Sequence, residues 1–464
     1  MTPEQNRKSV ADLIVSAGCV ITIDAQRRII LDGAVAVVGN DIVAVGKADE
    51  IRARFDALQS VDFKDGVLTP GLVDVHCHPA DYLIKNIIDE LPQIRRLRDM
   101  VIPYEDKITE DEAYVSSVAS MHDMIRQGTT SFMDAGSPQV SAVARAVTDT
   151  GIRGVVTGKT TDIAGHFGGA VQSLNEAIGL ADRTFEEFHG AAGGRLRVCY
   201  DLDSADSFSD ELAVLVRDHA RERGVGIVSH FVQRRPDGDV LGFRNPHVAR
   251  YAKFDLLGPD ITLVHMGWLP QSDVELIGQT GTNIAHCPGT SLIGGAGWVS
   301  HGVIPELAAA GANVALGTDA MVIGRVTDMR STMYLTTAAH RDARRLPDLW
   351  PAHKVLEMAT LAPAKAMGLA DRIGSLEVGK AADLVVFDAT HWRPLRFSHP
   401  VNDLVYGGAG SKVELVVIDG RIVHQDGKYT HNFDIEGVLA DVDRHSKASY
   451  DRLGIHPASQ WPIA

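Results

Sequence analysis

The sequence has few cysteines, no long apolar run and no excess of basic residues. Its 464 residues contain four cysteines without pairing spacing, so a disulfide framework is not expected. No segment approaches the roughly 18 apolar residues that span a membrane, and no signal-peptide pattern follows the polar start. The net charge of −15 argues against nucleic acid or an anionic membrane as a partner. These features predict a cytoplasmic protein.

Further absences narrow the fold class. No G-x-G-x-x-G motif follows the first strand of the central region, which argues against a doubly wound open sheet. No internal repeat or low-complexity segment is present either. Instead, strand-like and helix-like runs alternate between residues 72 and 319, with about eight strands in all. This number and length predict an α/β fold with a (β/α)8 barrel.

Both ends of the chain read as short β-strands and turns. Residues 10–67 contain apolar runs bounded by Gly and Asp, including a hairpin whose turn is expected at residues 39–41. The stretches 382–388 and 413–423 show the same pattern of short apolar runs. We therefore expect residues 1–68 and 376–464 to build one small β-sandwich, with residues 69–375 forming the barrel.

Polar residues recur where the predicted barrel strands end. His76 and His78 end the first strand, His230 the fifth, His265 the sixth and Asp319 the eighth. A single such residue usually has a structural explanation, such as a helix cap. In barrels, however, the C-terminal strand ends meet at the active site, so these side chains should converge. Imidazoles and a carboxylate suit Zn²⁺, Fe²⁺ or Co²⁺, and the sequence therefore predicts a metal site.

Longer stretches carry a family resemblance. They include Thr69-Pro-Gly-Leu-Val-Asp-Val-His-Cys-His, Ile284-Ala-His-Cys-Pro, Leu316-Gly-Thr-Asp-Ala, and Ile373-Gly-Ser-Leu-Glu-Val-Gly-Lys-Ala-Ala-Asp. In this order they resemble the metal-dependent amidohydrolase superfamily, in the branch with cytosine deaminase-like and triazine hydrolase-like members. The resemblance covers nearly the whole chain. It implies a barrel joined to a sandwich from both termini, and a homo-oligomer acting on small molecules.

The resemblance also assigns roles. It implies that His76, His78, His230 and Asp319 bind one divalent transition metal, with zinc expected and iron or cobalt as alternatives. Asp319 and His265 would be catalytic: Asp319 would carry the proton and His265 would polarise or steady the substrate. Relatives with two metals bridge them through a lysine on strand four. Residues 197–203 contain no lysine and Lys159 lies one strand earlier, so a single metal is expected.

Four further residues are predicted to contact substrate. Deaminases of this branch have Glu at the position of Gln233, and a neutral amide cannot take up and return a proton as a carboxylate does. His166 lies on a Gly-rich loop that resembles a Gly-Gly-His-Gly loop of amidohydrolases. His286 matches a histidine that in relatives either supports a metal ligand or faces the substrate, although a purely structural role is equally compatible. Trp268 is a candidate wall residue near the mouth.

Together these features predict a metal-dependent hydrolase in which metal-bound hydroxide cleaves a non-peptide C–N bond. Gln233 and the His166 loop favour an amide, urea or carbamate (including thiocarbamate) bond, and phenylurea and molinate hydrolases are the first relatives for comparison. The alternative is a deaminase or dechlorinase of a nitrogen heterocycle such as a purine, pyrimidine or triazine. A structural, non-enzymatic relative ranks below both, because such proteins often lack the metal histidines that this chain retains.

Overall fold

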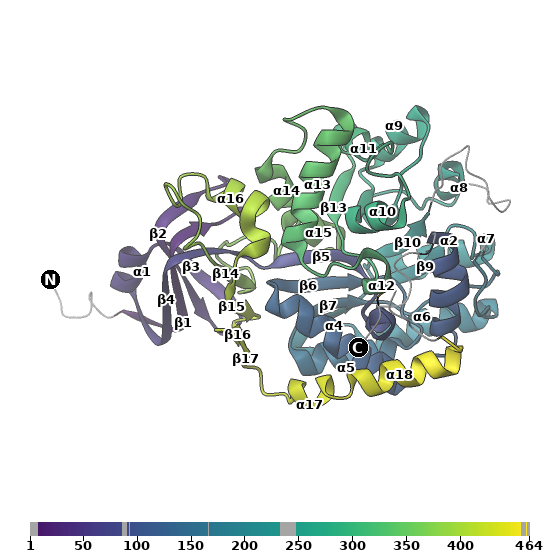
Figure 1. The fold of residues 1–464 in the computed structure, drawn as a ribbon, viewed down its shortest axis with the longest axis horizontal. Coiled ribbons are helices and arrows are strands. Elements are labelled where there is room, and N and C mark those ends of the chain that lie inside the picture. Colours follow the sequence, from purple (N-terminus) through teal and green to yellow (C-terminus); the bar gives the residue numbers. More distant parts are fainter. Residues whose placement is uncertain are drawn as a thin grey trace.

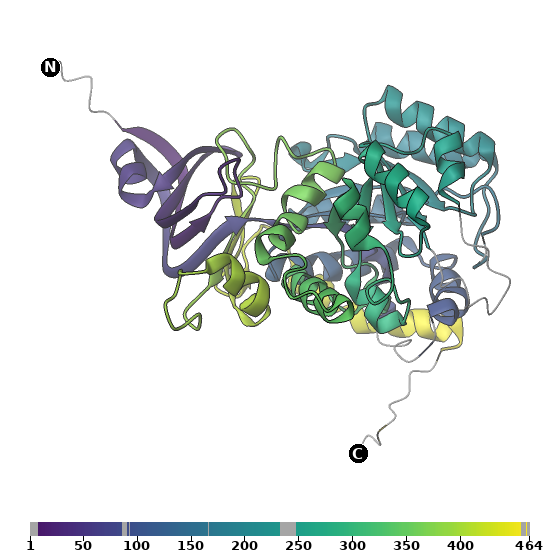
Figure 2. The same ribbon diagram turned by 90° about the horizontal axis from the view of Figure 1, so that it is seen from above.

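The computed structural model describes residues 8–85, 91, 93–165, 167–232, 247–455 and 461. Two lobes are visible, a β-rich lobe at the left of Figures 1 and 2 and a larger α/β lobe at the right. Among the described residues, no helix combines the length and apolar character needed to cross a membrane.

The smaller lobe is built from both ends of the chain. Its sheet has the order β17-β16-β15-β14-β4-β1-β2-β3, in which β1 and β4 are parallel and the other neighbours are antiparallel. The strands are β1 (Ser9–Ile21), β2 (Ile29–Val38), β3 (Asp41–Lys47), β4 (Phe55–Pro70), β14 (Leu384–Asp388), β15 (Val413–Ile418), β16 (Arg421–Gln425) and β17 (Lys428–Tyr429). The predicted hairpin turn is present between β2 and β3. Helix α1 (Ala48–Arg54) connects β3 to β4.

The larger lobe contains the predicted barrel strands, and paired neighbours among them run parallel. They are β5 (Leu72–Cys77), β6 (Thr129–Asp134), β7 (Arg153–Val156), β8 (Leu196–Val198), β9 (Tyr200–Ser204), β10 (Ile227–Phe231), β11 (Ile261–His265), β12 (Asn283–His286) and β13 (Asn313–Leu316). The fourth predicted strand is interrupted at Cys199, which separates β8 from β9. A bridge between Cys77 and Asp319 joins the first strand to the segment after the last. The predicted fold class, a (β/α)8 barrel with a small β lobe, is confirmed.

Helices surround the strands. The longer ones are α4 (Glu110–Arg126), α5 (Val140–Thr150), α6 (Leu174–Phe188), α7 (Asp210–Glu222), α9 (Gln271–Thr280) and α13 (Met329–Arg344). Capping boxes at Thr109 and Ser173 begin α4 and α6. The shorter elements are η2 (Pro79–Ile84), α2 (Gln93–Arg96), η3 (Leu97–Val101), α3 (Ile102–Glu105), η4 (Ala192–Gly194), α8 (Val248–Lys253), α10 (Pro288–Gly294), α11 (Ile304–Ala310), α12 (Met321–Gly324), α14 (Ala352–Met358), α15 (Leu361–Ala366), α16 (Pro400–Gly407) and η5 (Gly408–Gly410).

The C-terminal helices α17 (Ile435–Leu439) and α18 (Val442–Leu453) return to the barrel (Figure 1). Ser449 of α18 donates a hydrogen bond to Glu112 of α4 at 3.0 Å, and Arg452 pairs with the same carboxylate. The boundaries at residues 68/69 and 375/376 stay a prediction. The last helices, predicted to belong with the sandwich, pack instead against η2, α3 and α4.

The barrel interior is filled by alternate residues of the strands. One buried cluster holds Val73 and Val75 of β5, Met133 of β6 and Val228 of β10, together with Val155, Cys199, Val264, Ala285 and Ala315. Residues from α15 and the segment after it, such as Leu369, pack into the same cluster. This packed interior supports the strand ends where the polar residues stand.

Candidate metal centre

His76 and His78 stand together at the end of β5. Strict alternation after the inward-facing Val73 and Val75 would turn His76 away from the interior. The pairing of β5 with β6 shifts register between Asp74 and Cys77, and this irregularity accompanies the inward direction of both histidines. Their ring centroids lie 4.9 Å apart with perpendicular planes. The predicted pairing of the two imidazoles is therefore present.

The other strand ends bring three more side chains to the same place. Asp319 Oδ1 lies 3.5 Å from His76 Nε2 and 3.7 Å from His78 Nε2. Asp319 Oδ2 lies 3.7 Å from His265 Nε2. His230 Nε2 lies 3.3 Å from His78 Nε2. The donor atoms of His76, His78 and His230 form one set, and those of His76, His265 and Asp319 form another, each within 4.8 Å.

Two of these residues depend on unusual backbone conformations. Val264 faces the barrel interior, so alternation would direct His265 towards the helices, but a φ of 81° accompanies its turn into the mouth. Asp319 has a φ of 66°, and its N–H donates to the His76 carbonyl at 2.8 Å. Left-handed conformations at non-glycine residues cost energy and cluster at functional sites.

Gly317 permits the close approach of the last strand to the first. A Cβ atom at this position would lie 2.8 Å from His76 Cβ and 2.9 Å from the His76 carbonyl oxygen. Only glycine fits here without moving one of the two strands. The spacing between His76 and Asp319 is therefore fixed by this residue.

The protonation pattern calls for a cation. His230 Nδ1 donates to the Asp203 carbonyl at 2.7 Å, which leaves Nε2 with a lone pair directed at the centre. Both ring nitrogens of His76 are buried and lack a hydrogen-bond partner among the described residues. Converging imidazole nitrogens and a carboxylate match the N/O ligand set of a divalent transition metal. The residues present thus fit a metal ion.

Burial sets the charge of these groups. It lowers the pKa of His76, His78 and His230, and it lowers the pKa of His265 to about 4. Burial alone would raise the pKa of Asp319, but the facing imidazoles, His76 first among them, hold it well below the usual range. Neutral imidazoles and an ionised carboxylate are the forms that bind a metal.

A supporting layer holds Asp319 and His265. Thr290 Oγ1 donates to Asp319 Oδ2 at 2.7 Å, and the Ala320 N–H donates to Oδ1 at 2.6 Å. The Trp298 ring stacks on His265 with centroids 4.5 Å apart. Sequence reasoning missed Thr290 and Trp298, since neither lies at a strand end. Asp74 accepts a hydrogen bond from the Thr318 N–H at 3.0 Å. The sequence could have pointed to this residue, because it is a charged side chain within an otherwise apolar strand.

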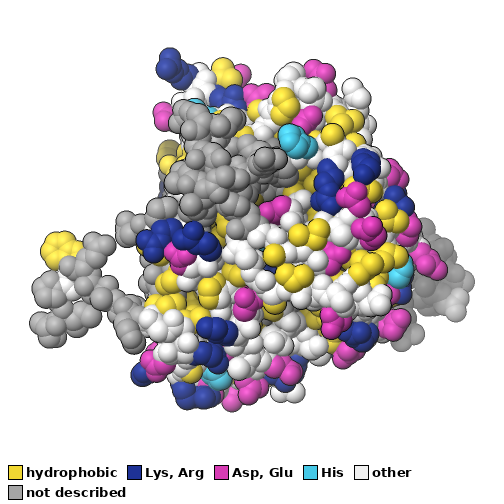
Figure 3. Space-filling model, turned by 90° about the vertical axis from the view of Figure 1, so that its right-hand side faces the viewer, with side chains coloured by type: hydrophobic (Ala, Val, Ile, Leu, Met, Phe, Trp, Pro, Cys, Tyr) yellow, Lys and Arg dark blue, Asp and Glu magenta, His cyan; other side chains and the backbone are white. Residues whose placement is uncertain are grey.

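A cavity of about 100 Å³ adjoins the centre, and His78, His230, His265 and Asp319 line it. Its wall also carries Lys159, whose Nζ lies 2.7 Å from Glu105 Oε2 and 3.6 Å from Asp203 Oδ1. Asp81 is buried on the same wall, and burial followed by the Glu105 charge raises its pKa well above the usual value. The barrel end away from the sandwich mixes acidic, basic and apolar side chains over its described part (Figure 3).

Two of the predicted substrate contacts, His286 and Trp268, lie within the described residues, and neither lines this cavity. Ala285 faces the interior, so His286 points outward, where its Nε2 lies 3.1 Å from His340 Nε2. A contact between His286 and substrate therefore stays a prediction. Trp268 donates to the Ala296 carbonyl at 3.3 Å and stacks on His301, and it does not line the cavity. Gln233 and His166 lie outside the described residues. Lys159, the lysine nearest to the fourth strand in the sequence, pairs with Glu105 and Asp203. The single metal stays a prediction.

Comparison with known proteins adds a family and relatives. Residues 67–423 match the amidohydrolase family. The chain is 32% identical over 423 residues to a 5-methylthioadenosine/S-adenosylhomocysteine deaminase of Syntrophobacter fumaroxidans, covering 90% of this chain and 94% of the relative. It is 30% identical to a 5'-deoxyadenosine deaminase of Methanosarcina barkeri, covering 96% and 100%. The structure of an adenosine deaminase from Xanthomonas campestris with bound zinc superposes with a TM-score of 0.86 at 25% identity, covering 97% and 100%.

Proposed function

The chain belongs to the amidohydrolase family and is a metal-dependent hydrolase of carbon–nitrogen bonds; from this premise we propose that it deaminates an aminopurine nucleoside. Water would replace the exocyclic amine, so that the C–N bond breaks, a C–O bond forms and ammonia leaves. The observation that carries the proposal is the similarity, over at least 90% of this chain, to relatives named as deaminases of adenosine derivatives. This reading corresponds to the alternative that the sequence left open.

We assign one zinc ion to His76, His78, His230 and Asp319. The donor chemistry supports this assignment, and so does the zinc in the similar adenosine deaminase. Bound there, the metal would supply Lewis acidity, which acidifies water and polarises the bond under attack. The hydrogen bond from His230 to the Asp203 carbonyl would hold that imidazole in the ligating tautomer.

Asp319 is the proposed proton carrier. Its carboxylate is ionised and buried, and Thr290 fixes one of its oxygens. It would take a proton from the attacking water and return it to the leaving nitrogen. His265, steadied by the Trp298 ring, would donate from Nε2 to the substrate as negative charge develops. The Lys159–Glu105 pair on the cavity wall suits polar substituents better than a bare aryl group.

Hydrolysis of an amide, urea or carbamate is the second candidate, and Gln233 is the observation that favours it. Ring deamination needs a proton on a ring nitrogen, and a Gln side chain cannot supply and recover one. Asp319 would then perform both transfers in a deaminase. An amide bond needs only one protonated leaving nitrogen, which Asp319 alone can serve.

A substrate panel separates the two. Zinc-loaded protein is assayed for ammonia release from adenosine, 5'-deoxyadenosine, methylthioadenosine and S-adenosylhomocysteine, and for hydrolysis of an anilide, a phenylurea and a thiocarbamate. The proposal expects turnover of at least one nucleoside and none of the second group. Turnover confined to the second group would overturn the deaminase assignment while retaining the family chemistry.

A further inference from the structure

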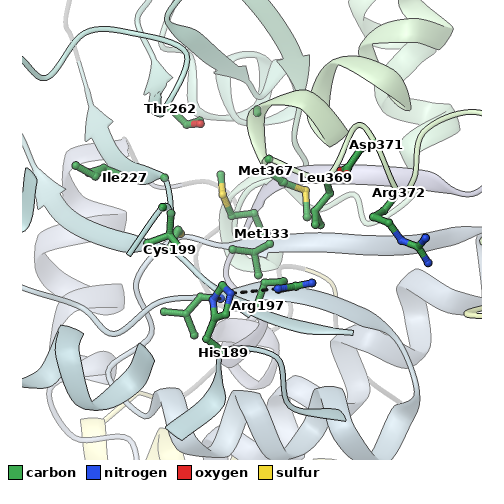
Figure 4. A pocket seen from close by; sticks show the side chains of 17 residues that line it. Met133, His189, Arg197, Cys199, Ile227, Thr262, Met367, Leu369, Asp371 and Arg372 are labelled. Carbon is green, nitrogen blue, oxygen red and sulfur yellow. Dashed lines mark hydrogen bonds between the residues drawn. The ribbon is translucent and has the colours of Figure 1, made fainter. Parts of the chain in front are cut away.

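A second cavity, of about 200 Å³, is shown in Figure 4. Its wall is formed where strands begin, by Arg197 of β8, Ile227 of β10 and Thr262 of β11, and by the segment 366–372 after α15. The metal-binding residues stand at the other ends of the strands. We propose that this cavity binds a small organic carboxylate, with Arg197 as the group that pairs with it.

Arg197 is directed into the barrel. Leu196 and Val198 pack between the strands and the helices, whereas Cys199 belongs to the interior cluster. Alternation along the strand therefore turns Arg197 inward on the same side as Cys199. Its neighbours in the cavity wall include the apolar Met133 and Ile227. A guanidinium in such surroundings needs hydrogen-bond acceptors.

The acceptors around Arg197 are incomplete. Its Nε is buried and has no hydrogen-bond partner among the described residues. Its Nη1 lies 3.2 Å from His189 Nε2, but His189 Nδ1 already accepts from the Val198 N–H at 3.3 Å. A neutral imidazole has one accepting nitrogen and a charged one has none, so His189 cannot accept at both positions. Either Arg197 Nη1 or the Val198 N–H therefore lacks an acceptor at His189, and Arg197 Nε lacks one as well.

The cavity wall does not neutralise this charge. Asp371, the one acidic side chain among its described lining residues, makes no hydrogen bond or ion pair with Arg197 and lies on the side away from His189 in Figure 4. Arg372 donates to Asp41 at 2.7 Å and to the Gly379 carbonyl at 2.9 Å, and is directed away from the cavity centre. Arg197 is therefore the free anion-pairing group.

The geometry selects the class of ligand. Nε and Nη on one guanidinium form a planar fork that matches the two oxygens of a carboxylate. The apolar wall, including Met133, Val155, Ile227 and Leu369, would enclose a short aliphatic chain. Since water occupies about 30 Å³ in the liquid, the cavity has room for a molecule of a few non-hydrogen groups. Isovalerate has this size and character.

Ligand-observed NMR titration of the zinc-loaded full-length protein tests the proposal. Isovalerate should bind at one site per chain with a Kd on the order of 1 mM. The neutral isostere isovaleramide should bind about tenfold more weakly, because it lacks the charge that Arg197 pairs with. Inorganic phosphate, which has no apolar body, should not displace isovalerate.

Variants locate the site. Arg197→Met should weaken isovalerate binding about tenfold, whereas Arg217→Met, which removes a cation outside this cavity, should leave it unchanged. Equal binding by Arg197→Met would place the ligand elsewhere, the metal centre included, and would overturn the proposal. Equal binding of isovaleramide, or displacement by phosphate, would also overturn it. Because the isovaleramide comparison uses the natural chain, it can still overturn the proposal if Arg197→Met fails to fold.

Discussion

Replacing Thr290 by valine should reduce turnover about tenfold to a hundredfold while leaving the metal content unchanged. Thr290 Oγ1 donates to Asp319 Oδ2 at 2.7 Å, and the two residues are only 1% and 6% exposed. Valine keeps the shape of the side chain but removes the donor. A hydrogen bond to a charged group contributes about 1.5–3 kcal/mol, and about 1.4 kcal/mol changes a rate tenfold.

The dependence of kcat on pH should also change in Thr290→Val. A hydrogen bond to a carboxylate favours the charged form, so its loss raises the pKa of Asp319. Asp319 must be ionised to accept a proton, and activity is therefore lost as pH falls through that pKa. The acidic limb of the profile of kcat against pH should thus move to higher pH in the valine variant.

Three measurements complete this test: kcat, KM and zinc content, each for Thr290→Val and for Thr290→Ser, which keeps the hydroxyl. The serine variant should behave as the natural protein does. Full turnover with an unmoved acidic limb in the valine variant would refute the proposed action of Thr290 on proton transfer. Loss of zinc would show that Thr290 supports the metal ligands instead.

Gly317→Ala should lower the free energy of unfolding, measured by denaturant titration, by about 1–3 kcal/mol, because the added Cβ meets His76. The control is Gly407→Ala, since no atom lies within 4 Å of a Cβ at that position. Gln233→Glu should raise ammonia release from the nucleoside substrate about a hundredfold, since a carboxylate can exchange the ring proton, and no gain would count against deamination. Burial and then the charge of Arg344 lower the pKa of His340 to about 3, so below about pH 6.5 the unfolded chain binds a proton that the folded chain does not. The contribution of His340 should therefore lower the free energy of unfolding by about 1.4 kcal/mol for each pH unit below 6.5. His340→Gln should flatten this dependence of the free energy of unfolding on pH.

The metal-binding set could be predicted because its members end strands. A barrel collects the C-terminal ends of its strands at one mouth, so His78, His230 and Asp319 needed no knowledge of loop structure. Alternation alone was insufficient for the neighbouring histidines. His265 and His286 each follow an inward-facing residue, but only His265 has the left-handed backbone, with a φ of 81°, that turns it to the mouth.

The supporting residues could not be predicted from the sequence. Thr290 and Trp298 follow β12 along the chain, and their contacts with Asp319 and His265 depend on how that segment folds back. The Lys159–Glu105 pair joins residues 54 positions apart on two different segments. Such contacts are set by tertiary packing, which short-range patterns do not encode.

Metal analysis of the purified protein and its His230→Gln variant decides whether these strand ends form a metal centre. The natural chain should bind one zinc per chain, and His230→Gln should lose both the zinc and the hydrolytic activity. His301→Gln, which alters an exposed imidazole, should keep both. Hydrolysis by a chain free of transition metal, or a full equivalent of zinc in active His230→Gln, would contradict the proposed centre.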